Sequence, residues 1–326
     1  MSFEARLNAC WYGPGGFCAW LRPLSWVYSW FVRRRRQRAQ PVHLPIPVIV
    51  VGNLVAGGAG KTPLVLWLVQ RLRAHGYHPG VISRGYGARG TAPRQARPDN
   101  RPEEVGDEPV LLARRGGVPV WVGRQRVAVG RALIAAHPEV DVIVADDGLQ
   151  HYALARDIEI VVVDGRRGFG NGHLLPAGPL REPLARLAEV DAVVINGSEP
   201  VPNVPDRHFV MQLAHFRFYN LAHPDRMVSA DHFAGRSVNA VAAIGHPERF
   251  FAALTGLGLA IQARAFPDHY AYRPADLPEG DTLMTEKDAV KCAGFARDDL
   301  WACAVDATLS EGLENDLITR LESLHG

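Results

Sequence analysis

The run "VIVVGNLVAGGAGKTPLVLWLVQRL", residues 48–72, places an apolar segment, a glycine-rich turn and a helical pattern in that order. A strand that leads through such a turn into a helix creates an anion site, because backbone N–H groups and the positive end of the helix face the turn. The common phosphate-loop pattern has glycine at position 55, where this chain has Val55. Because Gly57 and Gly58 supply backbone freedom nearby, we expect the loop to bind a nucleotide.

The residues of this loop have separate expected roles. Lys61 would reach the β- and γ-phosphates, and Thr62 would bind Mg²⁺. The other expected nucleotide contacts are Gly57, Gly58, Ala59 and Gly60. The alternative is a glycine-rich turn that only precedes a core helix, and Gly-Lys-Thr directly after a predicted strand disfavours it.

A second motif, "DVIVADDGLQH" at residues 141–151, provides the other part expected of a magnesium–nucleotide site. Four apolar residues of a predicted buried strand end at Asp146 and Asp147, where a carboxylate can hold Mg²⁺ directly or through water. An Asp-Asp-Gly turn is common by itself, so it gains weight only beside the phosphate loop. His151 is a candidate support for the same turn.

The whole chain has 326 residues, 47% of them hydrophobic and 21% charged, which is long enough for two folded domains. Its formal charge of +2 gives no global basis for nucleic-acid binding, so none is expected. Cys10, Cys18, Cys292 and Cys303 have no Cys-x-x-Cys spacing and are too few for a disulfide framework. We therefore expect four free thiols in a reducing compartment.

Short β-branched runs alternate with helical stretches after residue 38 and indicate an α/β fold. Runs that are apolar on both faces are typical of a parallel sheet covered by helices. We expect a phosphate-loop (P-loop) NTPase-like parallel-sheet domain at residues 39–205, a strand connector at 206–222 and a second, smaller α/β domain at 223–326. The predicted strands are "IPVIVV", "PGVIS", "VPVWV", "DVIVAD", "IEIVVVD" and "DAVVIN", then "VNAVAAIG", "AIQARAF", "DTLMTEKD" and "LWACAV".

The N-terminal segment, residues 1–38, is rich in aromatic and basic residues. It contains four of the seven tryptophans of the chain, followed by four consecutive arginines at 33–36. Its clean apolar run, residues 23–32, is far below the roughly 20 residues that a spanning helix needs, so we expect no crossing of a bilayer. Tryptophans at headgroup level and arginines near an anionic leaflet favour a membrane-associated helix at the interface. The alternative is a tryptophan-rich helix packed on its own domain.

Phosphate loops serve several classes of protein, so the loop alone does not name a reaction. A switch GTPase normally has Asn-Lys-x-Asp after a later strand, but Asn196 is followed here by glycine. An ATP- or GTP-driven accessory protein that loads a metal or cofactor into another enzyme would need a metal-ligand cluster and a dimerising loop, and the histidines here are scattered singly. A membrane-docked scaffold that binds ATP without turnover is a further alternative.

Seven motifs are spread along the chain: "GNLVAGGAGKTP" (52–63), "SRGYG" (83–87), "GDEP" (106–109), "DDGLQH" (146–151), "LPAGPLREP" (175–183), "FPDHYAY" (266–272) and "TEKDAVK" (285–291). In this order they resemble the tetraacyldisaccharide 4′-kinase family of lipid A biosynthesis, whose loop likewise lacks the outer glycine. The chain departs from the family pattern at Leu149, where an aromatic residue is expected, and at His246, where asparagine is expected.

The resemblance implies an ATP-dependent transfer of the γ-phosphate to the 4′-hydroxyl of a tetraacyldisaccharide 1-phosphate, which gives lipid IVA. It implies ATP as co-substrate, Mg²⁺ as cofactor and a place at the cytoplasmic face of the bacterial inner membrane, peripheral or monotopic. It also implies two α/β domains joined by a strand connector and a membrane-facing N-terminal helix.

The resemblance also assigns roles that the residues alone leave open. Asp107 by itself is better explained as a helix cap and His269 as a structural histidine, but in the family they form a catalytic pair. Arg181 and Glu182 resemble a charge clamp at the nucleotide and the metal, where the residues alone suggest a solvated pair. The resulting expectations are Asp107, His269 and Lys61 as catalytic residues, Arg181 with the loop as nucleotide contacts, Arg84, Tyr86 and Arg126 as substrate contacts, and Thr62, Asp146, Asp147 and Glu182 at the metal.

Overall fold

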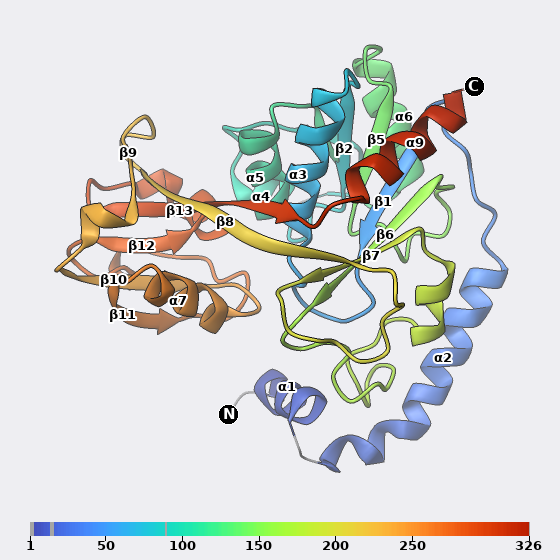
Figure 1. Ribbon diagram of the computed structural model, residues 1–326, viewed down its shortest axis with the longest axis horizontal. Helices are drawn as coiled ribbons and strands as arrows, with labels where there is room; N and C mark the ends of the chain where they lie inside the picture. Colours follow the sequence, from blue (N-terminus) through green and yellow to red (C-terminus); the bar gives the residue numbers. More distant parts are fainter. Residues whose placement is uncertain (1–2, 14–15, 89, 326) are drawn as a thin grey trace.

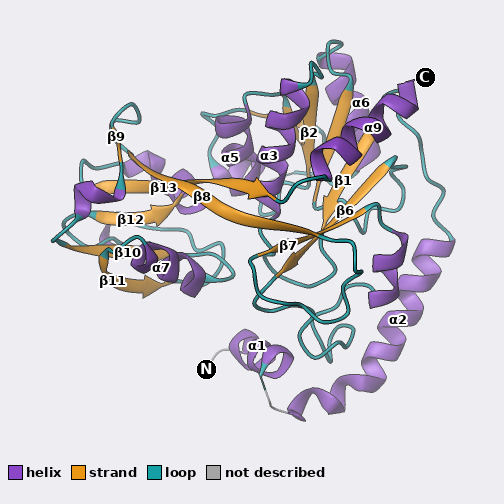
Figure 2. Ribbon diagram, viewed as in Figure 1, coloured by secondary structure: helices purple, strands orange, loops and turns teal. Residues whose placement is uncertain are grey.

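The structure, a computed structural model, describes residues 3–13, 16–88 and 90–325. Within these residues the chain forms one continuous sheet of thirteen strands with helices on both faces (Figures 1 and 2). Most neighbouring strands are parallel, and the expected mixed α/β fold with a large parallel sheet is confirmed.

The larger half of the sheet contains the phosphate loop. Its strands are β1 (Val48–Gly52), β2 (Pro79–Ser83), β3 (Arg94–Ala96), β4 (Val120–Val122), β5 (Val142–Asp146), β6 (Ile158–Asp164) and β7 (Ala192–Asn196). They pair in the order β7-β6-β1-β5-β2-β4-β3, and only β3 is antiparallel to its neighbour. The sequence predicted each of these strands except β3, whose three residues lack an apolar run.

Helices cover both faces of this half. They are α3 (Lys61–Ala74), α4 (Pro102–Val105), α5 (Asp107–Gly116), α6 (Arg126–Ala136), the short 3-10 helix η2 (Leu184–Glu189) and the C-terminal α9 (Leu313–His325). In β1, Ile49 packs in one apolar cluster with Leu64 of α3, whereas Val50 packs in the opposite cluster with Leu133 of α6. Successive strand residues point to opposite faces, so burial of both faces explains the unbroken apolar run.

The smaller half lies at the other end of the sheet (Figure 1). It contains β8 (Phe209–Asn220), β9 (Met227–Val228), β10 (Ser237–Ala242), β11 (Ala260–Ala265), β12 (Thr282–Thr285) and β13 (Leu300–Leu309), with α7 (Pro247–Gly256), α8 (Glu286–Cys292) and the short 3-10 helices η3 (Ala230–Phe233), η4 (Pro274–Asp276) and η5 (Ala293–Phe295). The predicted strand "DTLMTEKD" is wrong in its second part. The strand ends at Thr285, whose side chain caps α8 by accepting a hydrogen bond from Asp288 N, so residues 286–288 are helical.

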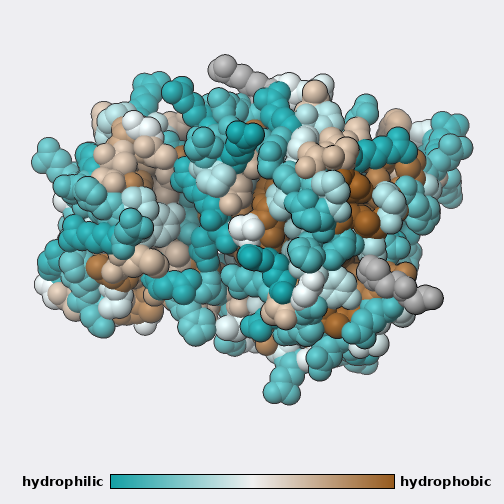
Figure 3. Space-filling model, turned by 90° about the horizontal axis from the view of Figure 1, so that it is seen from above, coloured by the Kyte–Doolittle hydropathy of each residue, from teal (hydrophilic) through white to brown (hydrophobic). Residues whose placement is uncertain are grey.

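Two long strands join the halves. β8 runs parallel to β7 at its start and antiparallel to β13 along its length, so the sheet continues without a break between the halves. The register of the β8–β13 pair shifts between Ala304 and Asp306, and His215 on the facing strand has a φ of 52°. These features mark a bulge, where a strand pair bends. The segment boundaries 1–38, 39–205, 206–222 and 223–326 stay predictions. Seen from above, the surface of both halves is mostly hydrophilic, with smaller hydrophobic patches (Figure 3).

The N-terminal segment forms α1 (Phe3–Tyr12), the 3-10 helix η1 (Gly16–Leu21) and α2 (Arg22–Gln37), which lies along the larger half (Figure 1). One face of α2 packs on the protein: Ser25 Oγ donates a 2.8 Å hydrogen bond to Leu174 O, and Tyr28 OH donates a 3.2 Å bond to Arg181 O. In the described part of the chain, every helix is too short or too polar to cross a membrane.

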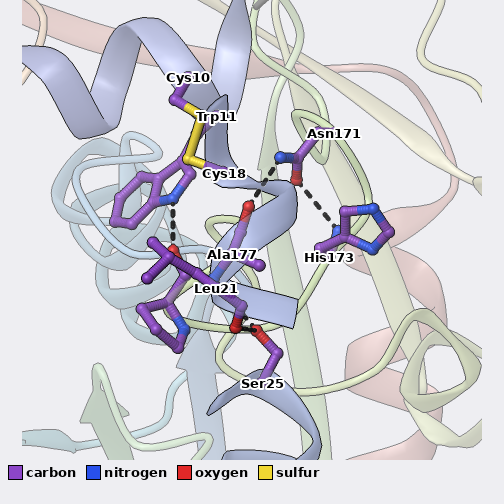
Figure 4. Close-up of a disulfide and its surroundings, with 9 residues drawn as sticks. Cys10, Trp11, Cys18, Leu21, Ser25, Asn171, His173 and Ala177 are labelled. Carbon is purple, nitrogen blue, oxygen red and sulfur yellow. Dashed lines mark hydrogen bonds between the residues drawn. A yellow bond between two sulfur atoms is a disulfide. The ribbon is translucent and has the colours of Figure 1, made fainter. Parts of the chain in front are cut away.

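The expectation of four free thiols is wrong for two cysteines. Cys10 and Cys18 form a disulfide next to Trp11, whose indole N–H donates to Pro176 O (Figure 4). Both cysteines are buried where η1 folds back against α1. Their spacing of eight residues gave no signal in the sequence, because it is the packing of η1 on α1 that brings them together. Cys292 and Cys303 are free and buried.

Candidate functional site

The phosphate loop connects β1 to α3 and is held in shape by two asparagines. Asn53 is fully buried and its Nδ2 donates a 3.0 Å hydrogen bond to Gly57 O. Asn196, at the end of β7, donates a 3.0 Å bond from Nδ2 to Ala59 O. Gly60 has a φ of 87°, and a β-carbon there would lie 2.0 Å from Asn196 Nδ2, so no side chain fits. Neither asparagine carries a sequence signal that predicts this role.

Lys61 begins α3 and points at the Asp-Asp motif. Its Nζ lies 3.4 Å from Asp147 Oδ1 and 3.4 Å from Asn53 Oδ1. Arg181 reaches the same carboxylate, with Nη1 3.3 Å from Asp147 Oδ1. Burial opposes ionisation of Asp147, but Lys61 and Arg181 outweigh it and lower the pKa of the carboxyl to about 2. The structure thus brings two predicted phosphate-binding cations to one carboxylate.

Asp146, the last residue of β5, lies deeper than its neighbour. Ser83 Oγ, at the end of β2, donates a 3.1 Å hydrogen bond to Asp146 Oδ2. The other oxygen, Oδ1, is buried and has no hydrogen-bond partner among the described residues. Burial and the nearby Glu108 raise the pKa of Asp146. A carboxylate oxygen left unpaired at the carboxyl edge of a parallel sheet fits a cation ligand.

Glu182 joins this cluster through Gln150. Gln150 Nε2 donates a 2.8 Å hydrogen bond to Glu182 Oε1, and Gln150 Oε1 accepts from Arg181 Nη1 at 3.3 Å. Arg186 lies on the other side, with Nε 3.6 Å from Glu182 Oε2. Glu182 is buried, so its carboxylate depends on these neighbours. Among the described residues, no three His, Cys, Asp or Glu side chains gather as a ready metal cluster.

The three predicted substrate contacts differ in exposure. Arg126 is buried, donates from Nη1 to Gly123 O at 2.8 Å and from Nη2 to Asp146 O at 3.3 Å, and burial lowers the pKa of its guanidinium to about 10. Arg84 is exposed and close enough to repel the Arg126 charge. Tyr86 is 63% exposed, and its ring centroid lies 4.8 Å from that of His269. His151 is neutral at pH 7, because burial, Arg126 and Arg84 lower its pKa to about 4.

Asp107 and His269 meet where the two halves of the molecule face each other. His269 Nδ1 donates a 3.0 Å hydrogen bond to Asp107 Oδ2. Asp107 is the first residue of α5, after Gly106 at the N-cap position, and its Oδ1 accepts a 2.9 Å hydrogen bond from Glu108 N, so it supports the start of the helix as well as bonding His269. Burial opposes ionisation of Asp107, but the bond from His269 and the Lys287 ammonium lower the pKa of the carboxyl below its ordinary value. The same bond raises the pKa of His269 above its ordinary value.

The smaller half also reaches the phosphate loop. Gly245 follows β10, and a β-carbon built on it would lie 3.5 Å from Gly58 N. Arg167 Nη2 donates a 3.4 Å hydrogen bond to Gly245 O from the larger half. His246, one of the two residues that depart from the family pattern, is the N-cap residue of α7. The loop after β10 therefore closes one side of the site over the glycines.

The Asp107–His269 pair, called the dyad below, should have a measurable effect on the titration of His269. We expect His269 to titrate above the histidine reference of about 6.5 and to return toward it in Asp107→Asn, because the amide removes the charge that stabilises the imidazolium. Imidazole NMR over a pH series checks this, with His269→Gln to assign the signal. Exposed backbone signals distant from Asp107 serve as the control for an unchanged fold. An unchanged His269 pKa in Asp107→Asn contradicts the coupling.

Comparison with known proteins places the chain in a family. Residues 17–322 match the family model for tetraacyldisaccharide-1-P 4′-kinases. The chain belongs to this family. The resemblance carried by the seven sequence motifs is therefore confirmed.

Individual tetraacyldisaccharide 4′-kinases align with almost all of the chain. The one from Dechloromonas aromatica is 53% identical over 307 residues, which is 92% of each chain. The one from Methylobacillus flagellatus is 46% identical over 331 residues, 99% of this chain and 98% of that relative. A crystal structure of LpxK from Aquifex aeolicus in complex with ATP has a TM-score of 0.77 and 28% identity, covering 94% of this chain and 99% of that one.

Proposed function

We propose that this protein transfers the γ-phosphate of ATP to the 4′-hydroxyl of a tetraacyldisaccharide 1-phosphate and so forms lipid IVA. Membership in the kinase family supports this reaction class. The observation that carries the proposal for this chain is the Asp107–His269 hydrogen bond across the boundary between the halves, beside a phosphate loop. A hydroxyl acceptor placed at that boundary would face the nucleotide on one side and Asp107 on the other.

Each step of the transfer has a group in this chain. Lys61 and Arg181, which share Asp147 in the described structure, would turn to the β- and γ-phosphates and offset the charge that develops there. Asp107 would accept the hydroxyl proton, since its lowered pKa keeps it ionised at pH 7. His269 would orient Asp107 through the bond from Nδ1.

ATP as co-substrate is supported by the relative from Aquifex aeolicus, whose crystal structure contains ATP. For Mg²⁺, the unpaired buried oxygen of Asp146 fits, and the oxygen donors of Thr62, Asp147 and Glu182 are of the type that the ion prefers. Bound there, Mg²⁺ would neutralise charge on the β- and γ-phosphates. The unpaired oxygen makes Asp146 the strongest candidate for a direct ligand.

The lipid disaccharide would enter beside Arg84, Tyr86 and Arg126. Tyr86 packs against His269, so it can place a sugar ring next to the dyad. Arg84 and Arg126 bring positive charge that suits a phosphorylated sugar. These contacts belong to the proposal and give the substrate its expected orientation.

The decisive experiment uses the full-length protein. It is incubated with γ-labelled ATP, Mg²⁺ and detergent-dispersed tetraacyldisaccharide 1-phosphate, and the lipid fraction is examined for label. Labelled lipid that appears only with the acceptor supports the kinase. ATP hydrolysis without labelled lipid favours an accessory nucleotide-driven protein, and ATP binding without hydrolysis favours a scaffold.

We also propose that the N-terminal segment docks on the cytoplasmic face of the inner membrane, as a peripheral or monotopic attachment. While Ser25 and Tyr28 face the protein, large apolar side chains on the other side are exposed: Trp20 87%, Leu24 55%, Trp26 75%, Trp30 54% and Phe31 60%. The arginines at 33–35 continue the exposed surface. An apolar face beside arginines suits an interface with anionic headgroups. One face of α2 thus supports the alternative of a helix packed on its own domain, and the opposite face supports that of a helix at the membrane interface.

This docking can be tested without removing the helix. The triple substitution of Trp20, Trp26 and Phe31 by serine is expected to weaken binding to anionic vesicles at least about tenfold, because apolar contacts with the interface are lost. Sedimentation with vesicles measures the binding, and high salt should weaken the binding of the unaltered protein. Met227→Ser, which removes an apolar side chain that is 54% exposed on the smaller half, is the matched control. Undiminished binding of the triple variant would place the attachment elsewhere.

A further inference from the structure

Lysine is rare in this chain, and each of its lysines lies near the candidate site. Of the 36 lysines and arginines only three are lysines, at positions 61, 287 and 291, and all the others are arginine. Lys61 belongs to the phosphate loop. Lys287 and Lys291 lie four residues apart on α8 of the smaller half, so they share one face of that helix. The fold brings both of them to Asp107, with Nζ 3.9 Å from Oδ2 in each case.

Lys287 connects carboxylates from both halves. Its Nζ lies 3.0 Å from Glu108 Oε1 and 3.9 Å from Asp107 Oδ2, both on α5 of the larger half. It also lies 3.8 Å from Asp268 Oδ1, in the loop that carries His269. The Lys287 side chain is only 16% exposed, so these contacts are made largely out of solvent.

We propose that Lys287 is a positioning residue for the phosphoryl transfer: it holds Asp107 ionised and fixes α5 to the loop that carries His269, with Lys291 as a second, weaker support. The inference rests on the proposed kinase function, because it assigns Lys287 a part in preparing the base. Lys287 acts through Asp107 and the neighbouring carboxylates. Lys291 is the weaker support because its Nζ lies 2.9 Å from Asp288 Oδ1, so its charge is paired mainly with that carboxylate.

The compactness of the ammonium group explains why lysine stands here in an arginine-rich chain. One ammonium has three donors around a point charge, so it can serve three carboxylates that approach from different directions. A guanidinium is planar and larger, and it pairs best with a single carboxylate through two parallel bonds. The expected outcome of Lys287→Arg is therefore a retained charge with imperfect positioning.

The charges around Asp107 determine the sign of the pH effect. His269 and Asp268 face it from the loop after β11, with Tyr86 packed on His269. Lys287 and Lys291 face it from α8, where Asp288 pairs with Lys291, and Glu108 is its neighbour on α5. Lys287 lowers the pKa of both Asp107 and His269. Removing its charge therefore raises both pKa values. As the pH is lowered, activity should then begin to fall at a higher pH than in the unaltered enzyme, whichever of the two groups must be deprotonated.

The kinetic test compares Lys287→Met, Lys287→Arg and the unaltered enzyme. In Lys287→Met we expect kcat to fall about tenfold or more and the acid limb of kcat/KM to move up by about one pH unit, with the KM for ATP little changed. Lys287→Arg should keep the acid limb in place while kcat stays reduced. Arg320→Met, which removes an exposed cation from α9, is the control and should change neither quantity. A Lys287→Met enzyme with a reduced kcat but an unmoved acid limb overturns the proposal.

A second measurement does not depend on turnover. Protein labelled with ¹³C-lysine has three side-chain signals, which Lys287→Met and Lys291→Met assign. Burial opposes the Lys287 charge, but Glu108 and Asp107 raise its pKa, so we expect a titration above the lysine reference that moves downward in Asp107→Asn. A Lys287 signal indifferent to Asp107→Asn overturns the inference. Absence of labelled lipid with the unaltered enzyme instead refutes the proposed function, and the lysine titration then still tests the contact itself.

Discussion

Replacing Lys61 by alanine is expected to lower kcat at least about a hundredfold while the protein stays folded. Lys61 is the phosphate-loop cation that reaches toward the Asp146–Asp147 pair, with Nζ 3.4 Å from Asp147 Oδ1. Its loss removes charge compensation that the transferred phosphoryl group needs most in the transition state. The initial rate of labelled-lipid formation at saturating ATP and lipid measures the effect.

The fold should survive this substitution because its neighbours keep other partners. Asp147 retains Arg181 at 3.3 Å, and Asn53 retains its bond to Gly57. Arg71→Ala, a basic residue of the same helix that is 49% exposed in its side chain, is the matched control and should keep normal turnover. Near-normal activity of a folded Lys61→Ala protein, as judged by circular dichroism and thermal unfolding, would remove the phosphate-loop interpretation.

Removing either member of the Asp107–His269 pair is expected to cost about a hundredfold to a thousandfold in kcat, with little change in ATP affinity. Because the 3.0 Å bond makes the two groups act as one unit, the double alanine variant should be scarcely worse than the more damaging single variant. A double-mutant cycle of kcat with saturating substrates measures the coupling. The same cycle between Asp107 and the exposed His208 is the control, and there the effects should multiply.

Two results would contradict the dyad. Losses at Asp107 and His269 that multiply independently would mean that the groups work separately. A His269→Ala variant that only raises the KM for the lipid would make this histidine a substrate contact, a role that its packing against Tyr86 also permits.

The sequence predicted best what is contiguous along the chain. The phosphate loop and the Asp146–Asp147 pair each follow a buried strand, and parallel neighbours carry them to the same edge of the sheet. Local pattern alone was therefore enough to predict that Lys61 and Asp147 belong to one site. Pairing Asp107 with His269, 162 positions apart, needed the family resemblance, because no spacing rule connects residues from two halves.

Groups whose role depends on packing were missed. Asn53 and Asn196 shape the loop through hydrogen bonds to backbone carbonyls, and amide side chains in loops carry no distinctive sequence signal. The Cys10–Cys18 disulfide depends on the packing of η1 on α1. Lys287 had one usable signal, the scarcity of lysine in an arginine-rich chain, but the three carboxylates around it become visible only in the fold.

The two-stranded connection of β8 and β13 has a consequence for the entropy of catalysis. A flexible linker would let the smaller half diffuse, and His269 would meet Asp107 at an effective concentration set by the length of that linker. Here the halves share one hydrogen-bonded sheet, and Arg115 of α5 pairs with Asp306 at the bulge, with a nitrogen–oxygen distance of 2.6 Å, and with Glu286 at the start of α8. The translational and rotational freedom that a mobile half would lose at each turnover is therefore given up once, when the chain folds.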